Sequence, residues 1–244
     1  MGGVLETFTG ELRYTSNEEG RRGAERGRES FRIDIHRDGS RILAAHAEID
    51  DAPAVVRDVN QRIGPDGRPK DSFVRIAVDG KFRGSGWFRF GKNIAECEAM
   101  TTIEGRISQR MELDIPLVAF GNHAIINDCF LLSLFDMSKG PGIQLVEHMY
   151  LSSPDHRGAT GPMFFPIKLA IQYHGREEIE VEAGRFEAYK FSFPDVPGLL
   201  EEHPEYDLWC TTDGHYILLK AAVGGYMQTR YELASLNHVR HNGA

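Results

Sequence analysis

The sequence has 244 residues with a formal net charge of -8, and 41% of them are hydrophobic, enough apolar side chains for a large buried core. An acidic chain lacks the basic face that phosphate backbones attract, so nucleic acid is excluded as a partner. No 18-residue apolar run predicts a membrane span and no signal peptide is visible, so we expect a cytoplasmic protein.

The three cysteines are widely spaced, at Cys97, Cys129 and Cys210. No CxxC pair indicates a zinc site, and an odd number of distant cysteines does not make a disulfide framework. We therefore expect buried thiols in a reducing compartment.

The first half of the chain alternates apolar and polar residues, with Gly-containing turns at the spacing typical of β-sandwiches and barrels. Strands are predicted at residues 5–14, 30–39, 41–50, 54–63, 72–80 and 85–91. The basic segment 21–28 is interrupted by acids and glycines, which favours a solvated hairpin tip.

One helix is predicted, at residues 126–140, with Asn127 or Asp128 capping its start and Gly140-Pro141 ending it. Its apolar residues form one broad face, which suits packing against a sheet. Further strands are predicted at residues 143–151, 163–175, 177–193, 206–223 and 226–236. The sequence thus predicts a single all-β domain over residues 1–244. We expect a large antiparallel curved sheet, half-barrel or barrel, with the helix packing against it or plugging it.

The second half carries a series of hairpin and strand residues at Val181, Gly184, Phe186, Leu208, Trp209, Asp213, Gly214, Leu218, Glu232 and Leu233. This series resembles bacterial half-barrel proteins related to the lipoprotein-localisation factors. It covers about half of the chain, and its motifs are structural. The resemblance implies a curved sheet around an apolar pocket suited to a hydrophobic small molecule. Members of that family are mostly exported, whereas this sequence shows no export signal. A cytosolic relative of the fold, the rearrangement enzyme of violacein biosynthesis, acts on an aromatic intermediate without a cofactor.

Motifs for nucleotide cofactors, zinc hydrolases and α/β-hydrolases are absent from the sequence. The ten histidines show no ligand spacing on one strand or helix, so a scattered metal site is only a weak third hypothesis. We expect no cofactor and no metal, and any chemistry then falls to side chains.

The segment LSSPDHRGATGP, at residues 151–162, is the strongest candidate for a catalytic loop. Turn formation accounts for its Pro and Gly residues but does not require Asp155, His156 and Arg157 between them. Asp155 can orient His156 as a general base, and Arg157 can hold a carboxylate or phenolate. A solvated turn is the competing interpretation.

The strand at residues 143–151 leads into this loop. Its alternation puts His148 and Tyr150 on one face, where they form a proton-transfer pair if that face lines a pocket. In the alternative, the other face is core and His148 points to water. Glu147 would then be a buried carboxylate with a raised pKa.

Further candidates for substrate binding are charged or aromatic. Arg57 shares a strand face with Val55 and Val59, which predicts a partly buried guanidinium in an ion pair or holding an acidic ligand. His123, just before the helix, is either a ligand contact or a helix-adjacent residue. The aromatic candidates for pocket walls, or alternatively for core, are Trp87, Tyr173, Trp209 and Tyr226.

Two functions follow from these residues. The first is a cofactor-independent enzyme of the lyase, decarboxylase or isomerase type, acting by acid–base chemistry on a hydrophobic, aromatic or phenolic small molecule in the barrel. The second is a non-catalytic carrier or sensor for a similar ligand, which needs the pocket but no positioned acid–base pair. A homodimer is also compatible with the sequence.

Overall fold

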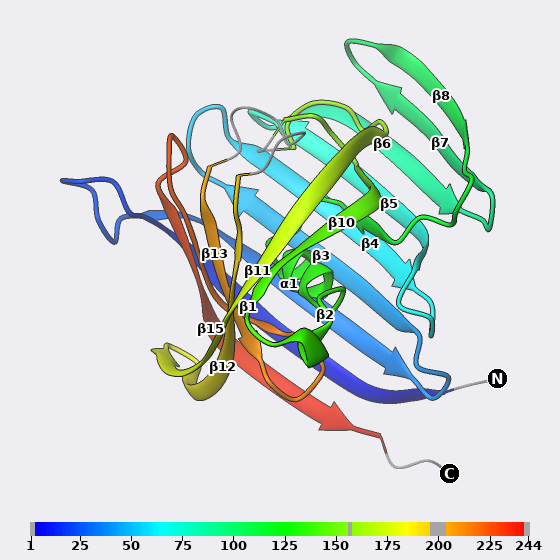
Figure 1. The fold of residues 1–244 in the computed structure, drawn as a ribbon. Coiled ribbons are helices and arrows are strands. Elements are labelled where there is room, and N and C mark those ends of the chain that lie inside the picture. The colour runs from blue at the N-terminus through cyan, green and yellow to red at the C-terminus, as the bar shows by residue number, and fades with distance from the viewer. Residues whose placement is uncertain (1–2, 156–157, 196–203, 242–244) are drawn as a thin grey trace.

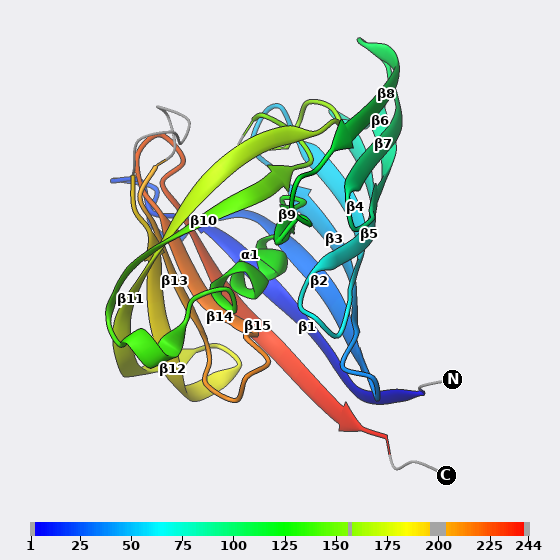
Figure 2. The same ribbon diagram turned by 45° about the vertical axis from the view of Figure 1, so that its right-hand side comes forward.

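A single sheet of 15 strands dominates the computed structural model, which describes residues 3–155, 158–195 and 204–241 (Figures 1 and 2). The strand order is β8-β7-β6-β5-β4-β3-β2-β1-β15-β14-β13-β12-β11-β10-β9. Neighbouring strands are antiparallel, except that β9 runs parallel to β10. Because β1 pairs with β15, the two halves of the chain join at the middle of one curved sheet. The all-β curved sheet predicted from the sequence is confirmed.

The strands of the first half are β1 (Val4–Ser16), β2 (Glu25–His36), β3 (Arg41–Ile49), β4 (Val55–Ile63), β5 (Pro69–Val78), β6 (Lys81–Phe90), β7 (Ile94–Thr101), β8 (Gly105–Glu112) and β9 (Ala119–Gly121). The second half contributes β10 (Gly142–Leu151), β11 (Phe165–Val181), β12 (Gly184–Phe193), β13 (Tyr206–Thr211), β14 (Leu218–Val223) and β15 (Thr229–Arg240). The hairpin β7–β8 is absent from the sequence-based prediction. It lies at the sheet edge. The strand β8 is exposed or half-buried along its whole length, and β7 buries only small side chains, including Ala95, Cys97 and Ala99, so the hairpin has little apolar alternation.

The concave face of the sheet carries the core. On β2 every second side chain is buried, including Phe31, Ile33 and Ile35, as expected for a strand with one face in the core. Figures 1 and 2 show the helix α1 (Ile125–Leu132) inside the curve of the sheet, and α1 packs against β9, β13 and β14. The helix thus fills part of a half-barrel.

The helix is shorter than predicted and is capped differently. It begins at Ile125, so Asn127 and Asp128 lie inside it rather than at its N-cap, and Ala124 at the cap makes no side-chain hydrogen bond. It ends at Leu132, and a separate 3-10 turn, η1 (Met137–Lys139), follows. The predicted range of 126–140 therefore combined two short helical segments.

The cap comes from the sheet. Glu29 on β2 is fully buried, and its carboxylate accepts hydrogen bonds from the backbone N–H groups of Ile125 (2.8 Å) and Ile126 (2.9 Å). The Tyr14 hydroxyl on β1 donates to the same carboxylate at 2.8 Å. A negative charge at these unpaired N–H groups also interacts favourably with the helix dipole. Glu29 therefore fixes the start of α1 against the sheet.

The segment between β10 and β11 closes the structure on its other side. Gln109 of β8 accepts a hydrogen bond from the Phe164 backbone N–H at 2.7 Å, which ties this segment to the edge strand. A Cβ atom on Gly86 of β6 would lie only 2.7 Å from Pro162 Cγ, so a glycine at this position allows the segment to lie directly on the inner face of β6. The segment is therefore packed against the sheet.

The first prediction concerns the Glu29 cap. In Glu29→Gln the amide nitrogen is a donor facing donors, so we expect a loss of about 2–3 kcal/mol in the free energy of unfolding, measured by chemical denaturation. The control, Glu25→Gln, changes an exposed glutamate on the same strand and should stay within about 0.5 kcal/mol of the wild type. Equal stability of the two variants would contradict the role of Glu29.

Candidate functional site

Two adjacent cavities lie between α1 and the sheet. The first, of about 100 Å³, is called the apolar arm. Its apolar wall is formed by side chains from α1 and from strands β10, β11, β12 and β14, namely Leu131, Met149, Ile167, Leu169, Phe193 and Val223. An apolar wall with a small number of polar groups is the kind of lining that small-molecule sites have.

The second cavity, of about 140 Å³, is called the polar arm. Its distinguishing residues are charged or hydroxyl-bearing, namely Tyr14, Arg26, Asp51, Arg57, Tyr226 and Thr229. The two arms share His123, Ile125, Met227 and Tyr231 as lining residues, so they lie side by side around the start of α1.

Asp128 is the acid of the apolar arm. It lies on the first turn of α1, and its Oδ2 atom accepts a hydrogen bond from the Tyr206 hydroxyl of β13 at 2.9 Å. Burial raises the pKa of Asp128 to about 7; the Tyr206 hydrogen bond opposes this shift and the charge of Glu29 adds to it. A carboxyl group that titrates near neutrality in an apolar cavity is a candidate proton donor or acceptor.

Three of the substrate-binding candidates line the polar arm, namely Arg57, His123 and Tyr226. As predicted, Arg57 shares a buried face of β4 with Val55 and Val59. Its guanidinium donates to the His123 backbone carbonyl, and it lies near enough to Glu29 for their charges to interact. Burial lowers the pKa of Arg57 and the negative charges around it oppose the shift. Ligand binding by these three residues stays a prediction.

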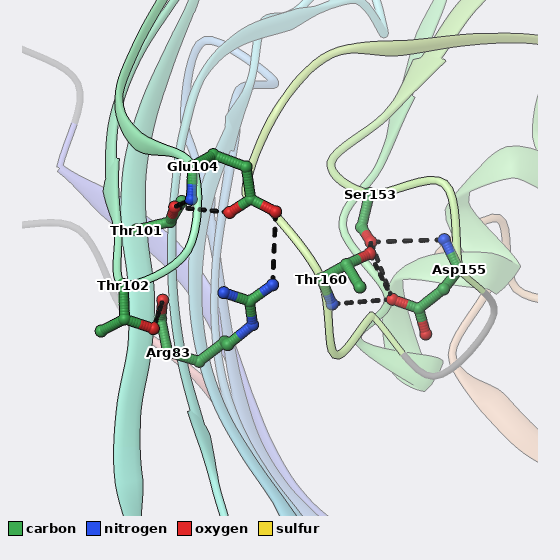
Figure 3. A network of polar contacts seen from close by, with 7 residues as sticks. All are labelled: Arg83, Thr101, Thr102, Glu104, Ser153, Asp155 and Thr160. Atoms are coloured by element: carbon green, nitrogen blue, oxygen red, sulfur yellow. Dashed lines mark hydrogen bonds and ion pairs between the residues drawn. The ribbon is translucent and has the colours of Figure 1, made fainter.

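The loop at residues 151–162 is held by Asp155 (Figure 3). Its Oδ2 atom accepts hydrogen bonds from the Thr160 backbone N–H (2.7 Å), the Thr160 hydroxyl (2.6 Å) and the Ser153 hydroxyl (3.1 Å). Burial acts to raise the pKa of Asp155, but the hydrogen bonds from Thr160 and from the Ala159 backbone, together with the charge of His123, outweigh it and the pKa is lowered. Asp155 thus joins the two ends of the loop as a structural acceptor. His156 and Arg157 lie outside the described residues.

The same loop lies over the polar arm. A Cβ atom on Gly158 would lie 2.6 Å from Arg57 Nη2 and 3.0 Å from the ring of His123. Gly158 also has a φ of 58°, so both its conformation and its surroundings favour glycine. The backbone of the loop at Gly158 therefore lies directly against Arg57 and His123.

The expected alternation along 143–151 breaks at a β-bulge. The pairing of β10 with β11 shifts between Val146 and Met149, and His148 adopts a φ of 59°. Val146 and Met149 are both buried, whereas His148 is exposed and Tyr150 packs against Phe164. The bulge therefore separates the predicted His148–Tyr150 pair, and no hydrogen bond joins these two described residues.

The expectation that Glu147 is a buried carboxylate is wrong. This side chain is exposed and pairs with Lys168 at 2.9 Å. The Lys168 hydrogen bond and charge lower its pKa, rather than burial raising it.

Both tryptophans lie on the outer face of the sheet, which corrects their assignment as pocket walls. Trp87 alternates with the buried Phe88 on β6 and is 43% exposed, with Arg89 over its ring. Trp209 is buried, but on the face opposite to Tyr206, where its ring lies between the ammonium groups of Lys190 and Lys220.

Tyr173 is a core residue. It packs against Phe191, with ring centroids 4.9 Å apart, and against Phe135 at 5.8 Å. It does not line either arm, so it is not a wall of the cavity as predicted.

The three cysteines are free and buried, as expected. Among the residues that the structure describes, no three His, Cys, Asp or Glu side chains gather as ligands for a metal ion. Over the same residues, no helix is long and apolar enough to cross a bilayer.

Comparison with known proteins shows a similarity of fold to solved structures. No protein-family model and no curated protein matches the sequence. Among solved structures, the chain is similar to a β-barrel-like protein of a domain of unknown function, DUF1849, from Brucella abortus, at 10% identity over 98% of each chain with a TM-score of 0.56. A putative lipoprotein from Parabacteroides distasonis is 10% identical over 96% of each chain, with a TM-score of 0.33. A putative exported protein with a YmcC-like fold from Bacteroides fragilis is 7% identical over 96% of each chain, with a TM-score of 0.32. The Brucella protein supports the expectation of a bacterial half-barrel fold.

Sequence reasoning missed Asp128 and Glu29 as site residues. Glu29 alternates with Phe31, Ile33 and Ile35, so an acid on an apolar strand face was a visible signal. The sequence pattern explains Asp128 as a residue that caps the helix. Because the helix begins at Ile125, Asp128 instead lies within it and lines the cavity.

The second prediction tests the environment of Asp128. Because its pKa is higher in the folded protein than in the unfolded chain, its stabilising contribution is complete below about pH 4 and is lost as the pH rises through about 7. Asp128→Asn cannot titrate. Its free energy of unfolding relative to the wild type should therefore rise by more than about 1 kcal/mol between pH 5 and pH 8.

Urea denaturation at several pH values measures this difference. The matched control is Asp207→Asn, which removes the carboxylate next to Tyr206 on β13. If both variants change alike with pH, the special environment of Asp128 is contradicted.

Proposed function

We propose that the protein binds a hydrophobic, aromatic small molecule in the apolar arm, as a carrier or sensor. The observation that carries this proposal is the cavity itself, whose apolar wall comes from α1 and from strands β10, β11, β12 and β14, with a few polar groups among the lining residues. Phe193, Tyr206 and Tyr231 offer aromatic surfaces there, and rings pack well against such surfaces. The cytoplasm is kept as the proposed compartment on the sequence alone.

The third prediction is that neutral aromatics bind saturably in this arm. Because both tryptophans face outward, the emission of the ligand itself is the suitable signal, and 2-methoxynaphthalene is a fluorescent probe of small size. Leu169→Trp fills the arm from β11 and should weaken binding at least about tenfold, the effect of losing roughly 1.4 kcal/mol of contact.

The control is Leu145→Trp, which adds the same side chain at a position on β10 that is 63% exposed. It should leave the affinity unchanged. Non-saturable binding, or equal weakening by the two substitutions, would contradict the proposal.

A cofactor-independent enzyme is the second candidate, because Asp128 has a pKa of about 7 and accepts a hydrogen bond from Tyr206 inside the cavity. An acid–base group of this kind suits proton abstraction in a lyase, decarboxylase or isomerase reaction. The likeness to the rearrangement enzyme of violacein biosynthesis is an analogy of fold and assigns no residue.

The fourth prediction distinguishes this enzyme from a carrier. With a hydroxyaryl ketone in deuterated water, nuclear magnetic resonance should show deuterium entering the position next to the carbonyl faster than in buffer. Asp128→Asn should lower that rate by about two to four powers of ten. Exchange at the buffer rate with the wild type would leave binding as the function.

A further inference from the structure

The hydrogen bonding of Asp128 and Tyr206 restricts which ligands fit the apolar arm. The Tyr206 hydroxyl has one proton, and it is used in the bond to Asp128 Oδ2. The other carboxyl oxygen, Oδ1, accepts no hydrogen bond from any described residue, and Asp128 lines the cavity. When Asp128 is ionised, this pair therefore presents only acceptors to a ligand.

The surroundings favour a neutral donor over a cation. Among the described residues that line the apolar arm, Asp128 is the only carboxylate, and the other polar side chains are His123, Tyr206 and Tyr231. Other groups acting on Asp128 are Glu29 from β2, which raises its pKa, and Arg57 from β4, which lowers it. A buried ammonium would face one partly protonated acid and apolar walls, and burial of a poorly paired charge is costly. A hydroxyl group needs only one acceptor.

We propose that the Asp128–Tyr206 pair recognises the hydroxyl group of a phenol-type ligand, whose ring lies among the apolar side chains of the arm and whose O–H donates to Asp128 Oδ1. The ring has a fitting neighbour in Phe193, which packs edge-on against Tyr206 with centroids 5.5 Å apart. This inference rests on the proposed binding function and names its ligand class.

The test compares 2-naphthol with 2-methoxynaphthalene, which differ by one methyl group on the oxygen. The wild type should bind 2-naphthol at least about tenfold more tightly at pH 8, since a hydrogen bond to a charged acceptor is stronger than one between neutral groups. Asp128→Asn keeps an acceptor without the charge and should reduce this preference. Asp128→Leu removes the acceptor and should abolish the preference, so that the two naphthalenes bind this variant with equal affinity.

A second measurement needs no variant. The preference of the wild type for 2-naphthol should grow between pH 5.5 and pH 8, as Asp128 loses its proton. Asp207→Asn is again the control and should behave as the wild type.

The outcomes separate the two proposals. If neither naphthalene binds, the proposed function itself fails. If both bind with equal affinity, if the preference survives in Asp128→Leu, or if 2-naphthylmethylamine binds more tightly than 2-naphthol, the binding function stands and the recognition of a hydroxyl is overturned.

Discussion

The structure depends on one buried carboxylate, Glu29, which joins the sheet to the start of the helix. A strand whose inward face is otherwise apolar presents this acid where the first N–H groups of α1 have no partners of their own. Burial raises its pKa, while the hydrogen bonds from Ile126, Ile125 and Tyr14 lower it. Because a short helix is unstable alone, its position follows from this contact and from packing.

The cavity is a consequence of that placement. The helix α1 occupies the curve of the sheet (Figure 2). Both cavities are lined by residues at its N-terminus, His123 and Ile125. The charged groups gather on one side, around Arg57, and the apolar wall lies on the other. Asp128 projects from the same helix into the apolar arm. The contact of Glu29 with the helix therefore also positions Asp128, the residue that we propose binds the ligand hydroxyl.

The strands were predictable because alternation is a local property, and so was the burial of Arg57 between Val55 and Val59. The edge strand β8 was not, since it is exposed or half-buried along its whole length and has no apolar stripe. On its partner β7 the buried residues are the small side chains Ala95, Cys97, Ala99 and Thr101, which make only a weak apolar pattern. The direction of His148 depends on a bulge set by pairing with β11, which the strand alone does not encode. Asp128 was read as a cap because the helix start is decided by Glu29, almost one hundred positions earlier in the chain.

The most direct test of ligand binding inside the curve is a methyl-labelled nuclear magnetic resonance titration with 2-naphthol. The account predicts saturable shifts at Leu131, Met149 and Ile167, which line the apolar arm, and none at Ile143 and Leu145, which are exposed on β10. Shifts confined to the exposed methyl groups, or spread evenly over both sets, would contradict the claim that the cavity beside α1 is the binding site.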